Sequence, residues 1–235
     1  MNNLKVGDET IPYEVKESAD ASLARIDIDP SGVKVVVPQG SDIDPEEFIE
    51  ERREWVLENY LEMQEILKEL PERSFEEGEK FPYRGKDLEI RYSDVAEPEV
   101  EDGELHFPRE ADGESPDEVL ENLLREEARE KIKEVIEEYS DRVEGSYNKI
   151  YIRNQKTKWG SCSGKNNLSF NFRLIMAPPE VLEYVVVHEL VHLEKPEHSK
   201  AFWRKLSDLL PDYQESKEWL KKNKMKLVLR KADVF

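Results

Sequence analysis

The sequence predicts an α+β protein in which short strand-like segments are followed by long amphipathic helices. Alternating apolar and polar residues, typical of strands, fill most of the first forty residues and return between residues 81 and 108. Three longer stretches place apolar residues at helical spacing, and each begins with a helix-start signal. We therefore expect an N-terminal part with a small antiparallel sheet and long helices, followed by a C-terminal part with a β-hairpin and further helices.

The N-terminal strand-like segments are short and are separated by turn residues. Apolar residues occupy every second position in residues 11–15 and in residues 33–37, whereas they recur imperfectly in residues 23–28. Pro30-Ser31-Gly32 predicts a turn between the last two of these segments. In the C-terminal part, residues 149–153 and 168–172 predict two strands of a hairpin with a long loop between them.

Two of the helices begin with similar sequences. Asp44-Pro45-Glu46-Glu47 combines an N-cap aspartate, a proline suited to the first turn and a glutamate three residues after the cap, and the helical spacing then continues to Pro71. Ser115-Pro116-Asp117-Glu118 repeats this chemistry before a helix that ends near Tyr139. The two start signals are the only internal repeat evident in the sequence, and the apolar stripes that follow them are expected to be core.

The polar segment at residues 110–114 predicts a boundary. We expect an N-terminal β-rich subdomain with one long helix over residues 1–114 and a catalytic domain over residues 115–235.

The charge of the chain is unevenly distributed. The net charge is -19, with 35 basic and 54 acidic residues; residues 146–235 hold 17 basic and 10 acidic residues, a net of +7, so residues 1–145 hold 18 and 44, a net of -26. A solvated acidic surface adapted to a salty cytoplasm is one interpretation of the first part. This acidic part disfavours binding to nucleic acid. The mildly basic remainder is compatible with an anionic substrate.

The sequence also indicates a compartment. Cys162 is the only cysteine and cannot form an internal disulfide, which is typical of a reducing compartment. The N-terminal residues lack the pattern of a signal peptide, and no apolar stretch approaches the roughly 18–20 residues that a membrane-spanning helix needs. We expect a cytoplasmic protein without a membrane partner, and the oligomeric state is not predicted.

The third helix carries the candidate site. It starts at Pro178-Pro179-Glu180 and contains His188-Glu189-Leu190-Val191-His192. Residues four apart lie on one helical face, so both imidazoles can reach a single ion while Glu189 points at a water on that ion. Zinc prefers nitrogen ligands, and a catalytic zinc site has three protein ligands and a fourth position for water. The pattern therefore predicts a zinc site that needs one more ligand.

His198 is the candidate third ligand. It lies six residues after His192 and just beyond Pro196, which should end the helix and could let the chain turn back toward the ion. The alternative is a helix that packs two histidines without a metal, but three of the four histidines fall within eleven positions, which favours a metal site. His106, beside Phe107 in a strand-like segment, is expected to be structural or exposed.

Four motifs in the C-terminal part carry a resemblance to a known family. They are Lys158-Trp159-Gly160-Ser161-Cys162-Ser163, Leu168-Ser169-Phe170-Asn171-Phe172-Arg173-Leu174, Val187-His188-Glu189-Leu190-Val191-His192-Leu193 and His198-Ser199-Lys200-Ala201-Phe202-Trp203. Together they resemble the YgjP-like family of metal-dependent hydrolases, which is related to the zincin metallopeptidases, including the SprT-like and WLM proteins. The resemblance is strong from Tyr147 to Trp219 and looser upstream. One departure is Glu17-Ser18-Ala19-Asp20, where family members tend to be basic.

The resemblance implies a zincin-like minimal metallopeptidase core and a mechanism. His188, His192 and His198 would ligate one zinc ion per chain. Glu189 would be the catalytic base that activates a zinc-bound water for attack on a peptide carbonyl, and it would later return the proton to the leaving group. Phe202 and Trp203, one turn after His198, are both expected to be core residues that anchor the helix of the third ligand.

Further residues are candidates for substrate binding or support. Trp159, Gly160, Ser161 and Cys162 could form the opposite wall of the site, since Gly160 permits close backbone approach and Ser161 can donate a hydrogen bond; a buried packing corner is the alternative. Cys162 is not expected to be a nucleophile. Asn171 and Arg173 could orient the substrate or support the site, or they could simply pack.

Three functions remain open at this point. The first is a metallopeptidase that acts on a peptide or protein. The second is a metal-dependent nucleoside triphosphate pyrophosphatase, because basic residues bracket the loop and could receive phosphate oxygens, although no glycine-rich phosphate loop is present. The third is a non-catalytic, zinc-stabilised interaction protein, which Glu189 disfavours because a structural zinc site needs no adjacent carboxylate.

Overall fold

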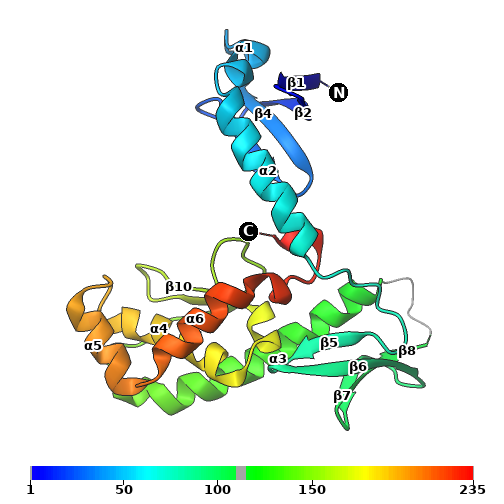
Figure 1. The fold of residues 1–235 in the computed structure, drawn as a ribbon. Coiled ribbons are helices and arrows are strands. Elements are labelled where there is room, and N and C mark those ends of the chain that lie inside the picture. Colours follow the sequence, from blue (N-terminus) through cyan, green and yellow to red (C-terminus); the bar gives the residue numbers. More distant parts are fainter. Residues whose placement is uncertain (1, 110–114, 235) are drawn as a thin grey trace. The chain divides into compact units, whose positions relative to one another are not determined.

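The computed structural model describes residues 2–109 and 115–234 and divides into two units (Figure 1). One unit extends as far as Leu70 and includes Val234; the other begins at Pro71. The expected boundary near residue 114 therefore differs from the division in the structure, and the predicted linker at 110–114 lies outside the described residues. The reason is that the strands at residues 80–108 bury their apolar side chains in the same core as the later helices.

The N-terminal unit contains a mixed four-stranded sheet. Its strands are β1 (Asn2–Val6), β2 (Glu9–Ser18), β3 (Arg25–Asp29) and β4 (Gly32–Pro38), in the order β1-β2-β4-β3. Two antiparallel hairpins, β1/β2 and β3/β4, are joined by the parallel pair β2/β4 at the centre. The prediction of a purely antiparallel sheet is therefore wrong for the central pair. Apolar alternation specifies which face of a strand is buried but not the direction of the strand.

Two helices, α1 (Pro45–Glu50) and α2 (Arg53–Glu69), occupy the stretch predicted as one helix. Asp44 caps α1 as expected, since its side chain accepts a hydrogen bond from the Glu46 amide at 2.9 Å. The interruption is at Arg52. Its main-chain amide donates a hydrogen bond to the Ile49 carbonyl, and its guanidinium donates one to the Phe48 carbonyl. Ile49 and Val56 belong to a core of their own with the N-terminal sheet.

The second unit begins with another four-stranded sheet. Its strands are β5 (Lys80–Tyr83), β6 (Lys86–Ser93), β7 (Glu99–Glu101) and β8 (Glu104–Pro108), in the order β5-β6-β8-β7. The two hairpins and the parallel central pair β6/β8 repeat the topology of the first sheet.

The repeat extends to the register of the central pair. Ser93 pairs with Pro108 at the end of β6/β8, as Ser18 pairs with Pro38 at the end of β2/β4. In both cases a helix starts shortly after that proline. The structure thus shows an internal repeat of a whole sheet and the helix start after it. In the sequence, only the two helix-start signals indicate this repeat.

Helix α3 (Pro116–Tyr139) is continuous and is followed by the short 3-10 helix η1 (Ser140–Arg142). The side chains of Ser115 and Glu118 form the expected capping box. A buried stripe that includes Leu124 and Ile132 packs α3 against the second unit's core.

A three-stranded sheet precedes the candidate site. Strands β9 (Ile150–Arg153), β10 (Gly160–Cys162) and β11 (Leu168–Asn171) lie in the order β10-β11-β9. Strands β9 and β11 run parallel, so they do not form the expected hairpin, and the hairpin partner of β11 is β10. The segment between β9 and β11 contains this extra strand, and the chain crosses over before it turns back into β11.

The remaining elements are helical. They are η2 (Phe172–Met176), α4 (Pro179–Glu194), α5 (Lys200–Leu209), α6 (Tyr213–Asn223), η3 (Lys224–Leu227) and η4 (Lys231–Asp233). Helix α4 packs against α3, α5, α6 and β10, and Figure 1 shows it between the green α3 and the red α6. The α+β class is confirmed. Among the helices that the structure describes, none is long and apolar enough to cross a membrane.

Candidate metal centre

Helix α4 positions two of the three candidate ligands. Its buried side chains, among them Val187 and Val191, fix the helix in the core, while His188 and His192 lie one turn apart with ring centroids separated by 4.9 Å. The helix ends at Glu194, just before Pro196, as the sequence predicted.

The chain turns after α4 and brings His198 back to the other two histidines. The Nε2 atom of His198 lies 3.0 Å from Nε2 of His188 and 3.2 Å from Nε2 of His192. His198 is followed by Ser199, which caps α5 by accepting a hydrogen bond from the Phe202 amide. One ligand atom from each of the three histidines lies within 4.8 Å of the others.

These separations fit a tetrahedral metal ion. Zinc–nitrogen bonds of about 2.0–2.1 Å in tetrahedral geometry place two nitrogen ligands about 3.3 Å apart. The Nδ1 atom of His192 lies 3.1 Å from the Lys195 carbonyl oxygen, which directs its Nε2 atom toward the other histidines.

The electrostatics of the histidines favour the neutral, ligating form. Burial lowers the pKa of His188 to about 3, and the neighbouring His192, His198 and Lys217 contribute to this shift. Burial also lowers the pKa of His192. Both imidazoles are therefore unprotonated at neutral pH, as metal ligation requires.

Two aromatic residues of α5 hold the triad. The Phe202 ring is fully buried and lies 4.6–4.8 Å, centroid to centroid, from each of the three imidazoles. Trp203 stacks on His198 at 5.5 Å with an interplanar angle of 22°. Phe202 is thus a core residue as expected, whereas Trp203 is half-buried, and both pack against the third histidine.

Glu189 projects from α4 toward β10. Only 6% of the residue is exposed, and burial raises the pKa of its carboxyl to about 7. The Cys162 amide donates a hydrogen bond to this carboxylate, and both this bond and the charge of Lys158 oppose the rise. Glu189 is thus a buried carboxyl group poised to gain or lose a proton near neutral pH.

Strand β10 approaches Glu189 so closely that a side chain would not fit. A Cβ atom added to Gly160 would lie 2.7 Å from both Cγ and Oε1 of Glu189. The expected wall, Trp159 to Cys162, therefore lies against the glutamate.

Strand β10 is also an edge of its sheet. The amide of Asn171 bonds to the Trp159 carbonyl and the amide of Ser163 to the Asn167 carbonyl, so residues 159, 161 and 163 face β11. Because pairing groups alternate along an antiparallel strand, the main-chain groups of Gly160 and Cys162 point away from β11, on the side where the Cys162 amide bonds to Glu189.

The other candidates take supporting places. Ser161 and Cys162 are half-buried, and burial, followed by the charge of Glu189, raises the pKa of the Cys162 thiol, which therefore stays protonated. Asn171 and Arg173 are fully buried, so of their expected roles only support or packing fits their exposure. His106 lies on β8, where its Nδ1 atom is 3.2 Å from the Ser93 hydroxyl, and takes no part in the triad.

Two residues lie near the triad that the sequence patterns did not identify as part of the site. Tyr184 lies one turn before His188 on α4 and contacts its ring edge to face at 5.8 Å, which i to i+4 spacing could have revealed. Lys217 lies on α6 with its ammonium 4.6 Å from the Trp203 ring centroid. No local pattern links Lys217 to the triad, because the contact is made by the packing of two helices.

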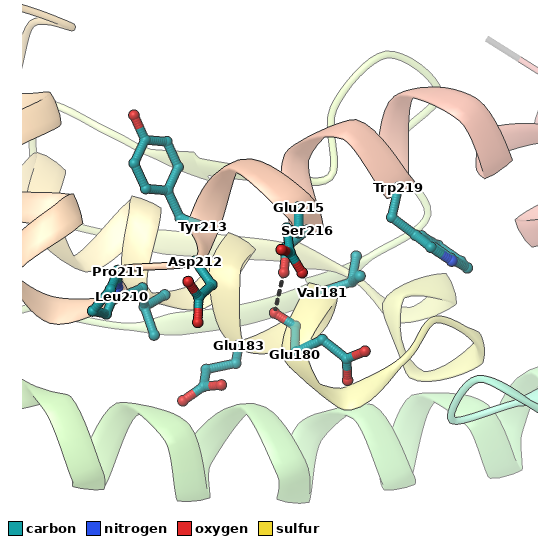
Figure 2. A pocket seen from close by; sticks show the side chains of 10 residues that line it. All are labelled: Glu180, Val181, Glu183, Leu210, Pro211, Asp212, Tyr213, Glu215, Ser216 and Trp219. Atoms are coloured by element: carbon teal, nitrogen blue, oxygen red, sulfur yellow. Dashed lines mark hydrogen bonds between the residues drawn. The ribbon is translucent and has the colours of Figure 1, made fainter.

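The triad does not line the cavity shown in Figure 2. That cavity, of about 410 Å³, is lined by the carboxylates of Glu180, Glu183, Asp212 and Glu215 and by Trp219, among others, from α4, α6 and the turn between α5 and α6. A dashed line in Figure 2 marks the 3.1 Å hydrogen bond that the Ser216 hydroxyl donates to the Glu180 carbonyl. The candidate site is therefore distinct from this cavity, and the geometry of its three histidines defines it.

Comparisons with known proteins add a family to this geometry. A family model described as YgjP-like, metallopeptidase domain, matches residues 23–223. The metallopeptidase zymogen abylysin of Pyrococcus abyssi is similar, with 22% identity, coverage of 41% of this chain and 95% of that chain, and a TM-score of 0.33. The zymogen jannalysin of Methanocaldococcus jannaschii has 24% identity, coverage of 52% and 99%, and a TM-score of 0.34. No curated protein sequence matches the chain.

Proposed function

Because the chain belongs to the YgjP-like metallopeptidase family, we propose that it is a zinc-dependent hydrolase that cleaves peptide bonds. The observation that carries this proposal is the convergence of three histidine Nε2 atoms beside a buried glutamate. In the proposed site His188, His192 and His198 hold one zinc ion.

The protein groups supply proton transfer and orientation. Zinc in this site would supply a Lewis acid that lowers the pKa of a water molecule and polarises a carbonyl oxygen. Glu189, with a pKa raised to about 7, is suited to accept the proton of the attacking water and to deliver it to the departing amine. The Cys162 amide orients this carboxylate, and Gly160 leaves it room.

The edge of β10 supports an extended peptide as the substrate. The Gly160 main-chain groups and the Cys162 carbonyl point away from β11, while the Cys162 amide is bonded to Glu189. A peptide can add to such an edge as a further strand through these remaining groups. Glu189 contacts the same two residues, so a peptide paired there would lie beside the proposed base.

The proposal is tested by incubating zinc-loaded protein with a degenerate peptide library and, in parallel, with a panel of nucleoside triphosphates. We expect cleavage of peptides. Glu189→Gln should keep about one zinc per chain and lose at least about 10²-fold in kcat, the low end of general-base catalysis. Glu197→Gln is the matched control, because Glu197 is an exposed glutamate next to the third histidine in the sequence.

Three outcomes would contradict the proposal. Full activity of Glu189→Gln would remove the glutamate from the mechanism. Turnover of nucleotides without peptide cleavage would replace the peptide by a phosphoanhydride substrate. Zinc binding without turnover of either panel would favour a zinc-stabilised interaction protein.

A further inference from the structure

A fully buried arginine stands at the centre of a polar network behind the site. Arg173, at the start of η2, has no exposed surface. Its guanidinium donates hydrogen bonds to Asn171 Oδ1 at 3.3 Å, to the Gln155 carbonyl at 3.1 Å and to the Leu227 carbonyl at 3.4 Å. Burial lowers the pKa of Arg173 to about 10, so the side chain remains charged at neutral pH.

One side of this network holds the loop that leads into β10. Asn171, also fully buried, donates its side-chain amide to the same Gln155 carbonyl at 2.7 Å and its main-chain amide to the Trp159 carbonyl at 2.8 Å. The Arg173 guanidinium carbon lies 5.4 Å from the centroid of the Trp159 ring. Trp159 directly precedes Gly160, which touches Glu189. Arg173 therefore contacts Trp159, the first residue of the wall of the site.

The other side of the network holds the segment after α6, residues 224–233. Leu227 is buried and its carbonyl accepts from Arg173, while Arg73 donates to the carbonyls of Lys226 at 3.0 Å and Val228 at 3.2 Å. Further along the segment, Asp233 accepts a hydrogen bond from the Asn154 side chain at 2.8 Å. The segment and the loop at residues 154–159 are thus linked by hydrogen bonds at two places.

We propose that Arg173 is a positioning residue that ties the segment at residues 224–233 to the loop at residues 154–159 and so keeps β10 against Glu189. A charge is costly to bury, so a buried arginine needs several well-placed acceptors, and the three named above come from both the loop side and the segment side. Its planar fork directs N–H donors from three nitrogens toward these acceptors, whereas a lysine has three donors on a single nitrogen and an apolar side chain has none. The proposed role does not require contact with the substrate.

The single cysteine of the chain offers a direct measurement of β10. Cys162 is half-buried on this strand, so the rate at which a thiol reagent modifies it in the metal-free protein reports local opening of the strand. We expect Arg173→Met to raise the modification rate about fivefold or more, and Arg173→Lys to raise it less, because local opening exposes the thiol. This measurement does not depend on the proposed function.

Arg125 provides the matched control. Its guanidinium carbon lies 4.6 Å from the centroid of the buried Phe172 ring, and its guanidinium donates a hydrogen bond to the Ile152 carbonyl in β9. Neither contact involves the loop before β10. Arg125→Met should destabilise the protein while it leaves the modification rate of Cys162 within about twofold of the wild-type rate. If Arg173→Met does not fold, Arg173→Lys carries the comparison.

The kinetic consequence rests on the proposed function. With a cleaved peptide as substrate, Arg173→Met should lower kcat about tenfold, since it displaces β10 from Glu189, and it should leave zinc content unchanged. The Arg173→Lys variant should recover part of this loss. Unchanged modification of Cys162 in Arg173→Met, or an equal rise in Arg125→Met, would overturn the positioning role even if the protein proves to be a peptidase.

Discussion

At the scale of single residues, the candidate site depends on three imidazoles that meet and on the close approach of Gly160 to Glu189. The spacing of His188 and His192 specifies one helical face, and a helix break before His198 allows the turn that brings the third imidazole to 3.0 Å from the first. The contact between Gly160 and Glu189 joins residues 29 positions apart. It depends on how β10 packs against α4, which no local pattern encodes.

That contact leads to a prediction for Gly160→Ala. The added methyl group would lie 2.7 Å from Glu189, whose buried side chain has little room to withdraw. We expect kcat for peptide hydrolysis to fall by about 10²-fold, the cost of moving a catalytic group by about 1 Å, with zinc content unchanged. Steady-state kinetics and metal analysis measure both quantities.

Gly164→Ala is the control for this substitution. Gly164 lies in the turn after β10, and a Cβ atom added there would have no neighbouring atom within 4 Å. The activity of this variant should equal that of the wild type. Wild-type activity in Gly160→Ala would show that the close approach to Glu189 has no role in catalysis.

At the scale of elements, helices were predicted better than sheets. Periodicity and capping residues placed the second helix at 115–139, and α3 spans Pro116–Tyr139. Strand direction was not predicted, because the alternation in β9 and β11 is the same whether the two strands run parallel or antiparallel. The parallel pairs in all three sheets became evident only from the structure.

Two tyrosine hydroxyls connect α3 to its neighbours and give a pH prediction. Tyr83 of β5 donates to Glu127 of α3 at 2.7 Å, and Tyr139 of α3 donates to Glu183 of α4 at 2.6 Å. Burial, and then the bonded carboxylate, raises the pKa of both tyrosines, that of Tyr139 to about 12. A phenol with a raised pKa stabilises the fold fully below its unfolded pKa of about 10 and loses this contribution as the pH rises through the folded value.

The free energy of unfolding should therefore fall between about pH 10 and pH 12. In a Tyr83→Phe/Tyr139→Phe double variant the fall should be shallower, although the variant is less stable at neutral pH because each carboxylate loses a hydrogen bond. Urea unfolding at a series of pH values measures this slope. Equal slopes for the two proteins would show that these tyrosines do not titrate with folding.

At the scale of the whole molecule, the chain contains a repeated four-stranded topology, and the three candidate metal ligands lie outside both copies. The first copy, β1 to β4, has its own core, whereas the second, β5 to β8, shares a core with α3 and with α4, the helix that carries the first two histidines. The repeat is not evident in the sequence. The two sheets share a topology but only a few turn and pairing positions, which are too few to form a recognisable sequence pattern.

The charge distribution is similarly uneven along the chain. The net charge of -26 lies in residues 1–145, whereas residues 146–235, which carry the triad, have a net charge of +7. The total of -19 therefore describes the environment of the triad poorly. Among the residues that the structure describes, His188, His192 and His198 are the one group of potential ligands close enough to hold an ion.

The most direct test of the central claim is a zinc titration of the metal-free protein by isothermal calorimetry. The wild type should bind about one zinc ion per chain, and His198→Ala should weaken binding by at least about 10-fold because one of three ligands is lost. His106→Ala, which alters the one histidine outside the triad, should bind as the wild type does. Unchanged zinc affinity in His198→Ala, or no binding by the wild type, would contradict the account.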